Sequence, residues 1–212
     1  MFAVGHISAT YLLTRGLKRV GWPSMSIPLV WAFSLLPDLD LLIPGVRHMG
    51  PTHSLLFAIV VLTFLILYRG REATPYFLAY ASHTILGDMI VNRSVQFLWP
   101  LTQRSYQIPL PFSRNPTFST NLELTLFGLF LLVFIITKDY ASGSHSNTTK
   151  LVTLIPITAL LVSVVFSFPV HVPLRLILPH LIFMVVVLQP FYPTSWTRAQ
   201  LVRLFHRPAC LS

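Results

Sequence analysis

Three aspartates lie within or beside strongly apolar stretches of the sequence, and histidines lie close to each of them along the chain. The aspartates are Asp38, Asp40 and Asp88, and the histidines are His6, His48, His53 and His83. A carboxylate in hydrocarbon is costly, so an ionisable residue there usually faces a partner or a wet cavity and serves a function. Carboxylates and imidazoles together are metal ligands. The pattern therefore predicts a metal site at a membrane.

The segment Pro37-Asp38-Leu39-Asp40 suggests how two of these carboxylates are presented. Residues two apart point about 200° from each other on an α-helix but to the same side of an extended backbone. Pro37 disfavours helical backbone at Leu36 and is expected to end a helix there. We therefore expect Asp38 and Asp40 to chelate a metal together. The alternative is a pair of helix-terminal aspartates at a water interface.

His53 follows the turn-forming residues Gly50 and Pro51, and Thr52 is expected to cap the next helix. His53 would then lie in the first helical turn. A helix N-terminus disfavours a protonated imidazole, which suits a neutral metal ligand. A histidine that lies only at the membrane interface is the alternative.

His83 and Asp88 are five residues apart, or about 140° around a regular helix. They cannot share one metal ion from an undistorted helix. Gly87 would allow a π-bulge or an early unwinding that brings them together. Otherwise Asp88 serves a second metal ion or orients another ligand.

The ligand types bear on the identity of the metal. Imidazoles and carboxylates without a thiolate fit zinc, and also manganese or iron, better than calcium. Several carboxylates can also bridge two ions, an arrangement used in phosphoester hydrolysis. The sequence leaves open whether one metal or two would bind.

The composition indicates the elements that must hold this site. Of 212 residues, 54% are hydrophobic and only 10% are charged, and the mean hydropathy is +0.69. Such a chain cannot cover a soluble globule with polar surface. We expect an all-α, multi-pass transmembrane helical bundle with about six to seven membrane helices. The apolar runs are 27–43, 55–68, 76–91, 122–137, 151–168 and 174–191, with a shorter run at 2–13.

We expect residues 1–212 to form a single integral membrane domain. Residues 1–125 carry the metal-site motifs, and residues 126–212 add further membrane helices and a basic cytoplasmic tail. Prolines break the helical pattern of segment 92–121, which is expected to be a long outer loop. A loop of that length is usually functional or disordered.

Lysine and arginine accumulate in cytoplasmic loops, so their positions predict the orientation. If the first run passes inward, the cytoplasmic basic residues are Arg15, Lys18, Arg19, Arg69, Arg71, Lys138, Lys150, Arg198, Arg203 and Arg207. Arg47, Arg93, Arg104, Arg114 and Arg175 would lie outside. The site residues would then gather at the extracytoplasmic side of a cell membrane.

The net charge of +9 does not indicate a nucleic-acid partner. The basic residues are dispersed and form no stripe that would follow a phosphate backbone. Attraction to anionic membrane lipids explains them.

The motifs together resemble those of the YdjM-type family of inner-membrane proteins, described as candidate metal-dependent hydrolases. They are Pro-Asp-Leu-Asp at 37–40, Gly-Pro-Thr-His-Ser-Leu-Leu at 50–56, Ser-His with a following Asp at 82–88 and Leu-Trp-Pro-Leu at 98–101, with a histidine near the N-terminus. The resemblance covers roughly residues 1–125. It implies the metal-ligand set His6, Asp38, Asp40, His53, His83 and Asp88. The chain departs from the family pattern at Met49, often basic in the family, and in the His83–Asp88 spacing, usually four.

The histidine and aspartate pattern is also similar, more distantly, to that of zinc-dependent phospholipases C. This resemblance points to a lipid or phosphoester substrate. We therefore expect a metal-dependent hydrolase in which His48, or whichever of Asp38 and Asp40 is free of metal, acts as general base, with Asp40 the expected choice of the two. Three arginines, Arg93, Arg104 and Arg114, are expected to bind an anionic head group, unless they only attract lipid phosphates.

Two other classes of function use the same residues. A metal-ion transporter would bind the ion in transit, although transporters often show paired repeats and sites near the midplane. A noncatalytic membrane scaffold would hold the metal as a structural element.

The remaining histidines are expected to be solvated, packed or interfacial; they are His145, His171, His180 and His206. Glu123 either complements a helix dipole or completes the site. The sequence gives no indication of oligomeric state.

Overall fold

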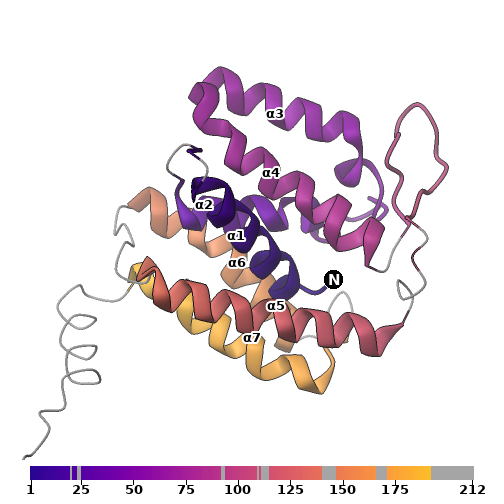
Figure 1. Ribbon diagram of the computed structural model, residues 1–212. Helices are drawn as coiled ribbons and strands as arrows, with labels where there is room; N and C mark the ends of the chain where they lie inside the picture. Colours follow the sequence, from indigo (N-terminus) through magenta and orange to yellow (C-terminus); the bar gives the residue numbers. More distant parts are fainter. Residues whose placement is uncertain are drawn as a thin grey trace, which may run out of the picture.

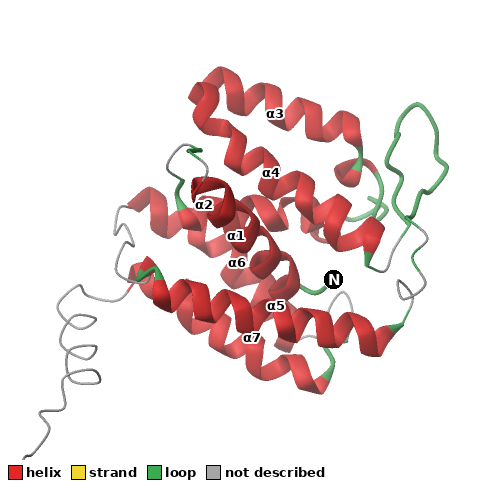
Figure 2. Ribbon diagram, in the orientation of Figure 1, coloured by secondary structure: helices red, strands yellow, loops and turns green. Residues whose placement is uncertain are grey.

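The computed structural model describes residues 1–19, 21–22, 25–91, 94–108, 110, 115–139, 147–165 and 171–191. Most of these residues are helical and none is in a strand, which confirms the all-α prediction (Figure 2). The elements are α1 (Ala3–Arg19), α2 (Ile27–Leu35), η1 (Leu36–Leu42), η2 (Pro51–His53), α3 (Leu55–Arg69), η3 (Gly70–Ala73), α4 (Thr74–Ser82), η4 (His83–Ile90), α5 (Pro116–Ile136), α6 (Asn147–Val165), α7 (Leu174–Val187) and η6 (Gln189–Phe191). The η elements are 3-10 helices, except that η4 is a π-helix.

Helix α1 occupies the centre of the bundle and contacts α2, α4, α5, α6 and α7. In Figure 1 the hairpin of α3 and α4 lies on one side of it, and α5 and α7 lie on the other. Small side chains at Ala3, Gly5 and Ser8 allow the neighbouring helices to approach closely. The first described helix of the chain is therefore surrounded by later ones.

An aromatic cluster fixes α1 against α5 and α7. Phe130 stacks on Phe183 with ring centroids 4.5 Å apart, and Tyr11 meets Phe130 edge-on at 4.9 Å. The hydroxyl of Tyr11 also donates to Asp139 at 2.6 Å, and Arg15 pairs with the same carboxylate at 2.8 Å. These contacts, about two turns along α1 from His6, set the depth of α1 in the bundle.

Three helical segments are long and apolar enough to cross a membrane: Pro116–Ile136, Thr148–Val165 and Leu174–Phe191. The predicted total of six to seven is not confirmed among the described residues. The helices nearer the N-terminus are shorter, since α2 passes into the 3-10 helix η1 at Leu36 and α4 passes into the π-helix η4 at His83. These changes of backbone geometry carry the candidate site residues.

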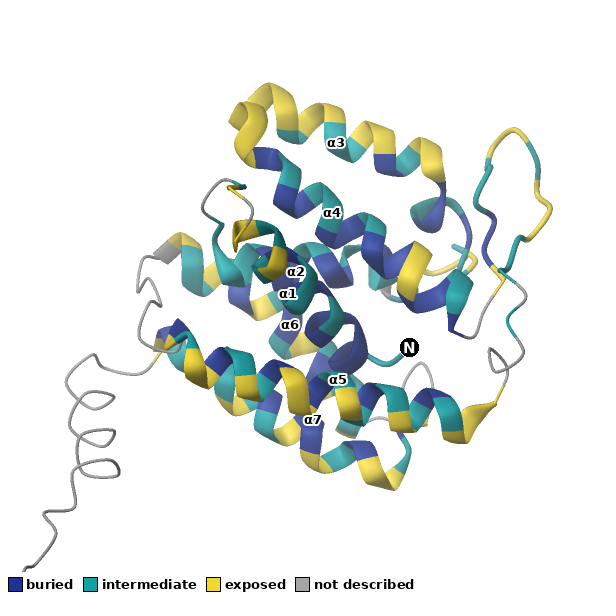
Figure 3. Cartoon of the chain, viewed as in Figure 1, coloured by how far each residue is buried: buried dark blue, intermediate teal, exposed yellow. Residues whose placement is uncertain are grey.

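Helix α3 presents a broad apolar surface that no other described element covers (Figure 3). Phe64 and Leu67 are 70% and 79% exposed, and Ile59 and Ile66 are each 48% exposed. An exposed apolar face of this extent marks an interaction surface. In an apolar helical protein this face suits lipid chains.

The predicted outer loop is shorter than residues 92–121, because α5 already begins at Pro116. The side chain of Asn115 accepts hydrogen bonds from the backbone N–H groups of Thr117 and Phe118, at 2.9 and 3.1 Å, and so caps this helix. Pro116 is the first residue of the helix, where its lack of a backbone N–H costs nothing because that N–H would have no partner within the helix.

Candidate metal centre

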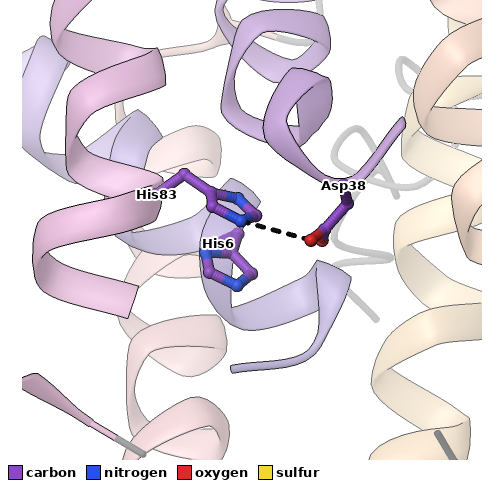
Figure 4. Close-up of side chains that lie close together, drawn as sticks. All are labelled: His6, Asp38 and His83. Carbon is purple, nitrogen blue, oxygen red and sulfur yellow. Dashed lines mark ion pairs between the residues drawn. The ribbon is translucent and has the colours of Figure 1, made fainter. Parts of the chain in front are cut away.

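Five side chains from four elements converge beside the N-terminal end of α1. They are His6 from α1, Asp38 from η1, His53 from η2, and His83 and Asp88 from η4. Figure 4 shows how His83 and His6 lie one above the other with Asp38 facing them. Ligand atoms of His53, His83 and Asp88 lie within 4.8 Å of one another, and so do those of His6, Asp38 and His83.

The π-helix η4 accounts for the close approach of His83 and Asp88. Their side chains point to one side, with Nε2 of His83 3.2 Å from Oδ2 of Asp88. A π-helix uses i→i+5 hydrogen bonds, so residues five apart lie on the same face, which an α-helix does not allow. Of the alternatives left open by the sequence, the structure shows the distorted helix.

Gly87 lies inside this π-helix against the ring of His6. A side-chain carbon at this position would overlap that ring. The imidazole of His6 is therefore packed between Gly87 and His83, on which it stacks with ring centroids 3.7 Å apart. Glycine is required here for close packing.

His53 is held between two carboxylates. Asp38 Oδ1 lies 3.6 Å from its Nε2, and Asp40 Oδ2 lies 3.5 Å from its Nδ1. The prediction of extended backbone at Asp38 and Asp40 is wrong, because a 3-10 helix spans Leu36–Leu42. At three residues per turn the two side chains diverge by about 240°, so they approach opposite edges of one imidazole.

The cap of α3 also differs from the prediction. Ser54 accepts from the backbone N–H of Phe57 at 3.2 Å, and α3 begins at Leu55. Thr52 and His53 precede it in the 3-10 turn η2. The hydroxyl of Thr52 instead donates to Asp40 at 2.8 Å, which places η2 against η1.

Asp40 organises a small network on the side of His53 away from Asp88. It accepts from Thr52 and contacts Nδ1 of His48 at 2.9 Å. The side chain of His48 is 22% exposed, whereas that of Asp40 is fully buried. Asp38, His48 and His53 also bring ligand atoms within 4.8 Å of one another.

Two backbone carbonyls that the sequence did not point to help to position the site. Nδ1 of His83 hydrogen-bonds the carbonyl of Ser34 at 2.6 Å, which leaves Nε2 facing the carboxylates. The hydroxyl of Tyr80 donates to the carbonyl of Thr52 and so ties α4 to η2. A backbone acceptor has no residue type, so no sequence signal could have identified these partners.

The centre of the cluster holds buried polar atoms that make no hydrogen bond within the described part of the chain. They are Nδ1 of His6, Nε2 of His53, Nε2 of His83 and both carboxylate oxygens of Asp88. Their residues are at most 2% exposed. Buried polar groups are nearly always satisfied. Nε2 of His53 and Nε2 of His83 lie 3.4 and 3.2 Å from Oδ2 of Asp88 without a hydrogen bond, and a bound cation would satisfy these atoms.

The protonation of His53 supports the same conclusion. This residue lies in η2, outside the membrane-spanning helices. Burial opposes its charged form, but the carboxylates of Asp38, Asp40 and Asp88 outweigh burial and raise the pKa of His53 well above its usual range. The same negative surroundings would favour a bound cation. The donor set of imidazoles and carboxylates fits zinc, manganese or iron.

Glu123, which the sequence left as a candidate member of the site, lies beside the start of α1. Its carboxylate is buried on α5 and accepts from the backbone N–H of Phe2 at 3.1 Å. An N–H at the start of a helix has no partner within that helix. Glu123 therefore anchors the beginning of α1 and is not among the residues whose ligand atoms cluster.

Of the three arginines predicted to bind a head group, the structure describes Arg104. Arg93 and Arg114 lie outside the described residues. Arg104 is exposed, with its guanidinium carbon 5.9 Å from the ring centroid of Tyr106. His180 is buried in α7, where Nδ1 bonds the carbonyl of Leu176 at 2.7 Å, in keeping with the predicted packing role.

Comparisons with known proteins give one result. No curated protein and no solved structure matches the chain. A family model described as "YdjM inner membrane protein" matches residues 1–172, which include every residue of the cluster. The chain therefore belongs to the YdjM inner membrane protein family.

Proposed function

We propose that this protein is a multi-pass, metal-dependent hydrolase that cleaves a phosphoester or lipid-linked substrate at the outer face of the membrane. The observation that carries the proposal is the group of buried ligand atoms on His53, His83 and Asp88 that make no hydrogen bond within the described residues. A purely structural polar cluster would be expected to satisfy these atoms internally.

We assign metal binding to His6, Asp38, His53, His83 and Asp88. Asp40 is assigned the role of orienting His53 and His48 through their Nδ1 atoms, as carboxylates commonly do for metal-bound histidines. A divalent ion in this position supplies Lewis-acid polarisation of the bond under attack and makes water more acidic. Zinc is the preferred ion, with manganese or iron as alternatives.

His48 is assigned the role of general acid or base. It is the partly exposed histidine of the network, and Asp40 fixes its ring as a carboxylate does in other acid–base pairs. Asp38 is also partly open, with 27% of its side chain exposed. A substrate therefore has access to the cluster from the side of Asp38 and His48.

The distribution of basic residues supports an outer position for the site. The C-terminal end of α1 carries Lys18 and Arg19, and the turn between α3 and α4 carries Arg69 and Arg71. In Figure 1 these ends lie on the left of the bundle, whereas the N-terminus lies on the right. Under the positive-inside rule the left side faces the cytoplasm.

The test uses the purified full-length protein loaded with zinc, manganese or iron and bis(p-nitrophenyl) phosphate as substrate. We expect metal-dependent release of p-nitrophenol. His48→Asn is expected to lower kcat at least 100-fold while the bound metal is retained. Asp40→Asn is expected to weaken metal binding about 10- to 100-fold. A metal-loaded wild type with no hydrolysis of any phosphoester would favour transport or a structural role.

A further inference from the structure

A cavity of about 520 Å³ adjoins the candidate metal centre. It lies among the start of α1, η1, the start of α5 and one face of α6, and Asp38 and His48 form part of its wall. Its volume falls in the range of small-molecule sites, about 300 to 1,000 Å³. These two residues are the partly exposed members of the site network.

The wall of this cavity away from the metal centre is apolar. Helix α6 contributes Leu154, Ile155, Ala159 and Val162. Two hydroxyls on the wall are already engaged, because Thr120 donates to the carbonyl of Pro116 at 2.9 Å and Ser163 donates to that of Ala159 at 2.7 Å.

The charges on this wall are unevenly placed. No lysine or arginine is among its described lining residues, and its ionisable side chains are Asp38, His48 and His171. The amino group of Met1, also on the wall, lies 3.7 Å from Oδ1 of Asp88 and so belongs to the end beside the metal centre. A phosphate group along the residues of α6 would therefore have no cation to compensate its charge. The polar part of a ligand belongs beside the metal centre, and an uncharged hydrocarbon part belongs along α6.

We propose that the substrate is a lipid phosphoester, whose phosphate lies at Asp38 and His48 and whose hydrocarbon chain occupies the cavity along α6. This inference rests on the proposed hydrolase function and names its substrate class. In the reaction, the oxygen of water bonds to phosphorus and the P–O bond to the leaving group breaks. One proton of water passes to the leaving alcohol, and no oxidant or reductant is needed.

Chain length tests this assignment directly. The substrates are alkyl p-nitrophenyl phosphates with ethyl, hexyl and dodecyl chains, each below its micelle concentration, and the protein is held in nanodiscs. Each buried methylene strengthens binding by about fourfold at most. We expect kcat/KM to rise at least 100-fold from ethyl to dodecyl. Equal values for the three substrates would overturn the cavity assignment and leave the hydrolase assignment intact.

A pair of tryptophan variants locates the chain. Thr158 lines the cavity on α6, whereas Leu161 is 42% exposed on the same helix and is not part of the lining. Thr158→Trp should lower the dodecyl-to-ethyl ratio of kcat/KM at least tenfold, because the indole occupies the space of the chain. Leu161→Trp should leave the ratio unchanged. An equal effect of both variants would contradict the proposal.

A binding measurement separates the two proposals when no hydrolysis is seen. A dodecyl phosphonate with a diazirine at the end of its chain is irradiated with the wild type, and labelled peptides are identified by mass spectrometry. Labelling within residues 154–163, lost in Thr158→Trp and kept in Leu161→Trp, supports the cavity even without activity. Labelling confined to the exposed face of α3 would show adsorption like that of any membrane lipid and would overturn it.

Discussion

Nε2 of His83 and Oδ2 of Asp88 lie 3.2 Å apart although five residues separate them in the sequence. The π-helix His83–Ile90 produces this contact. π-helical turns are rare and occur frequently at functional sites. The ring of His6 packs against Gly87 in the same turn, so the local backbone and the ligand set depend on one another.

Gly87→Ala should therefore lower metal affinity at least tenfold, because the added methyl group overlaps the ring of His6. Metal titration against a competing chelator measures the change. The matched control is Gly128→Ala on α5, where a side-chain carbon meets no neighbouring atom within 4 Å. Alanine favours a helix by about 1 kcal/mol over glycine, so this control should be neutral or stabilising. Unchanged affinity in Gly87→Ala would contradict the dependence of the site on the packing of His6 against this turn.

Removing single ligands should empty the site while the protein stays in the membrane. His53→Ala and Asp38→Ala should each lose most of the bound metal, since each removes a donor from the cluster. Elemental analysis of the purified variants measures this. His171→Ala is the control, because His171 lies outside the clustered residues. Full metal content in both ligand variants would contradict the assigned site.

Metal affinity should continue to increase at pH values above the usual pKa of histidine. Because the pKa of His53 is raised, more of this residue is protonated at a given pH than of a free imidazole, and the metal must displace that proton. One displaced proton gives about a tenfold gain in affinity per pH unit below the folded-state pKa. Titrations at pH 6, 7 and 8 should therefore show an increase in both intervals. A plateau already reached at pH 7 would indicate an unshifted histidine.

The orientation is tested by labelling cysteines in intact cells with an impermeant reagent, in a Cys210→Ser background. Ser105→Cys, in the exposed loop before α5, should react from outside. Glu72→Cys, exposed in the turn between α3 and α4, should react only after the cells are opened. The reverse pattern would place the candidate site in the cytoplasm.

The sequence was sufficient to predict the all-α fold and to bring His6, Asp38, His53, His83 and Asp88 into one proposed site. Residue type pointed to a site, since carboxylates and imidazoles are costly in apolar segments unless they meet, and the resemblance to the YdjM-type family implied which residues form it. The prediction for Asp40 was less accurate. Whether Asp40 points with Asp38 or away from it depends on the backbone after Pro37, and tertiary packing selects a 3-10 helix there.

The helix boundaries around the site also could not be predicted from the sequence pattern. Thr52 and Ser54 are both good helix caps. The choice between them depends on Asp40, which accepts a hydrogen bond from the hydroxyl of Thr52. The number of membrane helices was predicted from apolar runs, but the runs nearer the N-terminus contain 3-10 and π-helical turns. The cavity could not be predicted, because it is lined by segments far apart in the sequence, from α1 to α6.

The central position of α1 has a consequence for biogenesis. This helix carries His6 and is made before the helices that surround it. During synthesis the hydroxyl group of Thr10 on α1 lacks its partner until a later helix is made. In the folded protein it hydrogen-bonds Ser82 on α4 at 2.8 Å. Domains generally fold as units and expose incomplete surfaces until they are whole. Helices α5 to α7 also contact α1 and are made later still. A chain truncated after η4 would therefore contain His6, Asp38, His53, His83 and Asp88 but lack these helices, and we expect it to reach the membrane without a competent site.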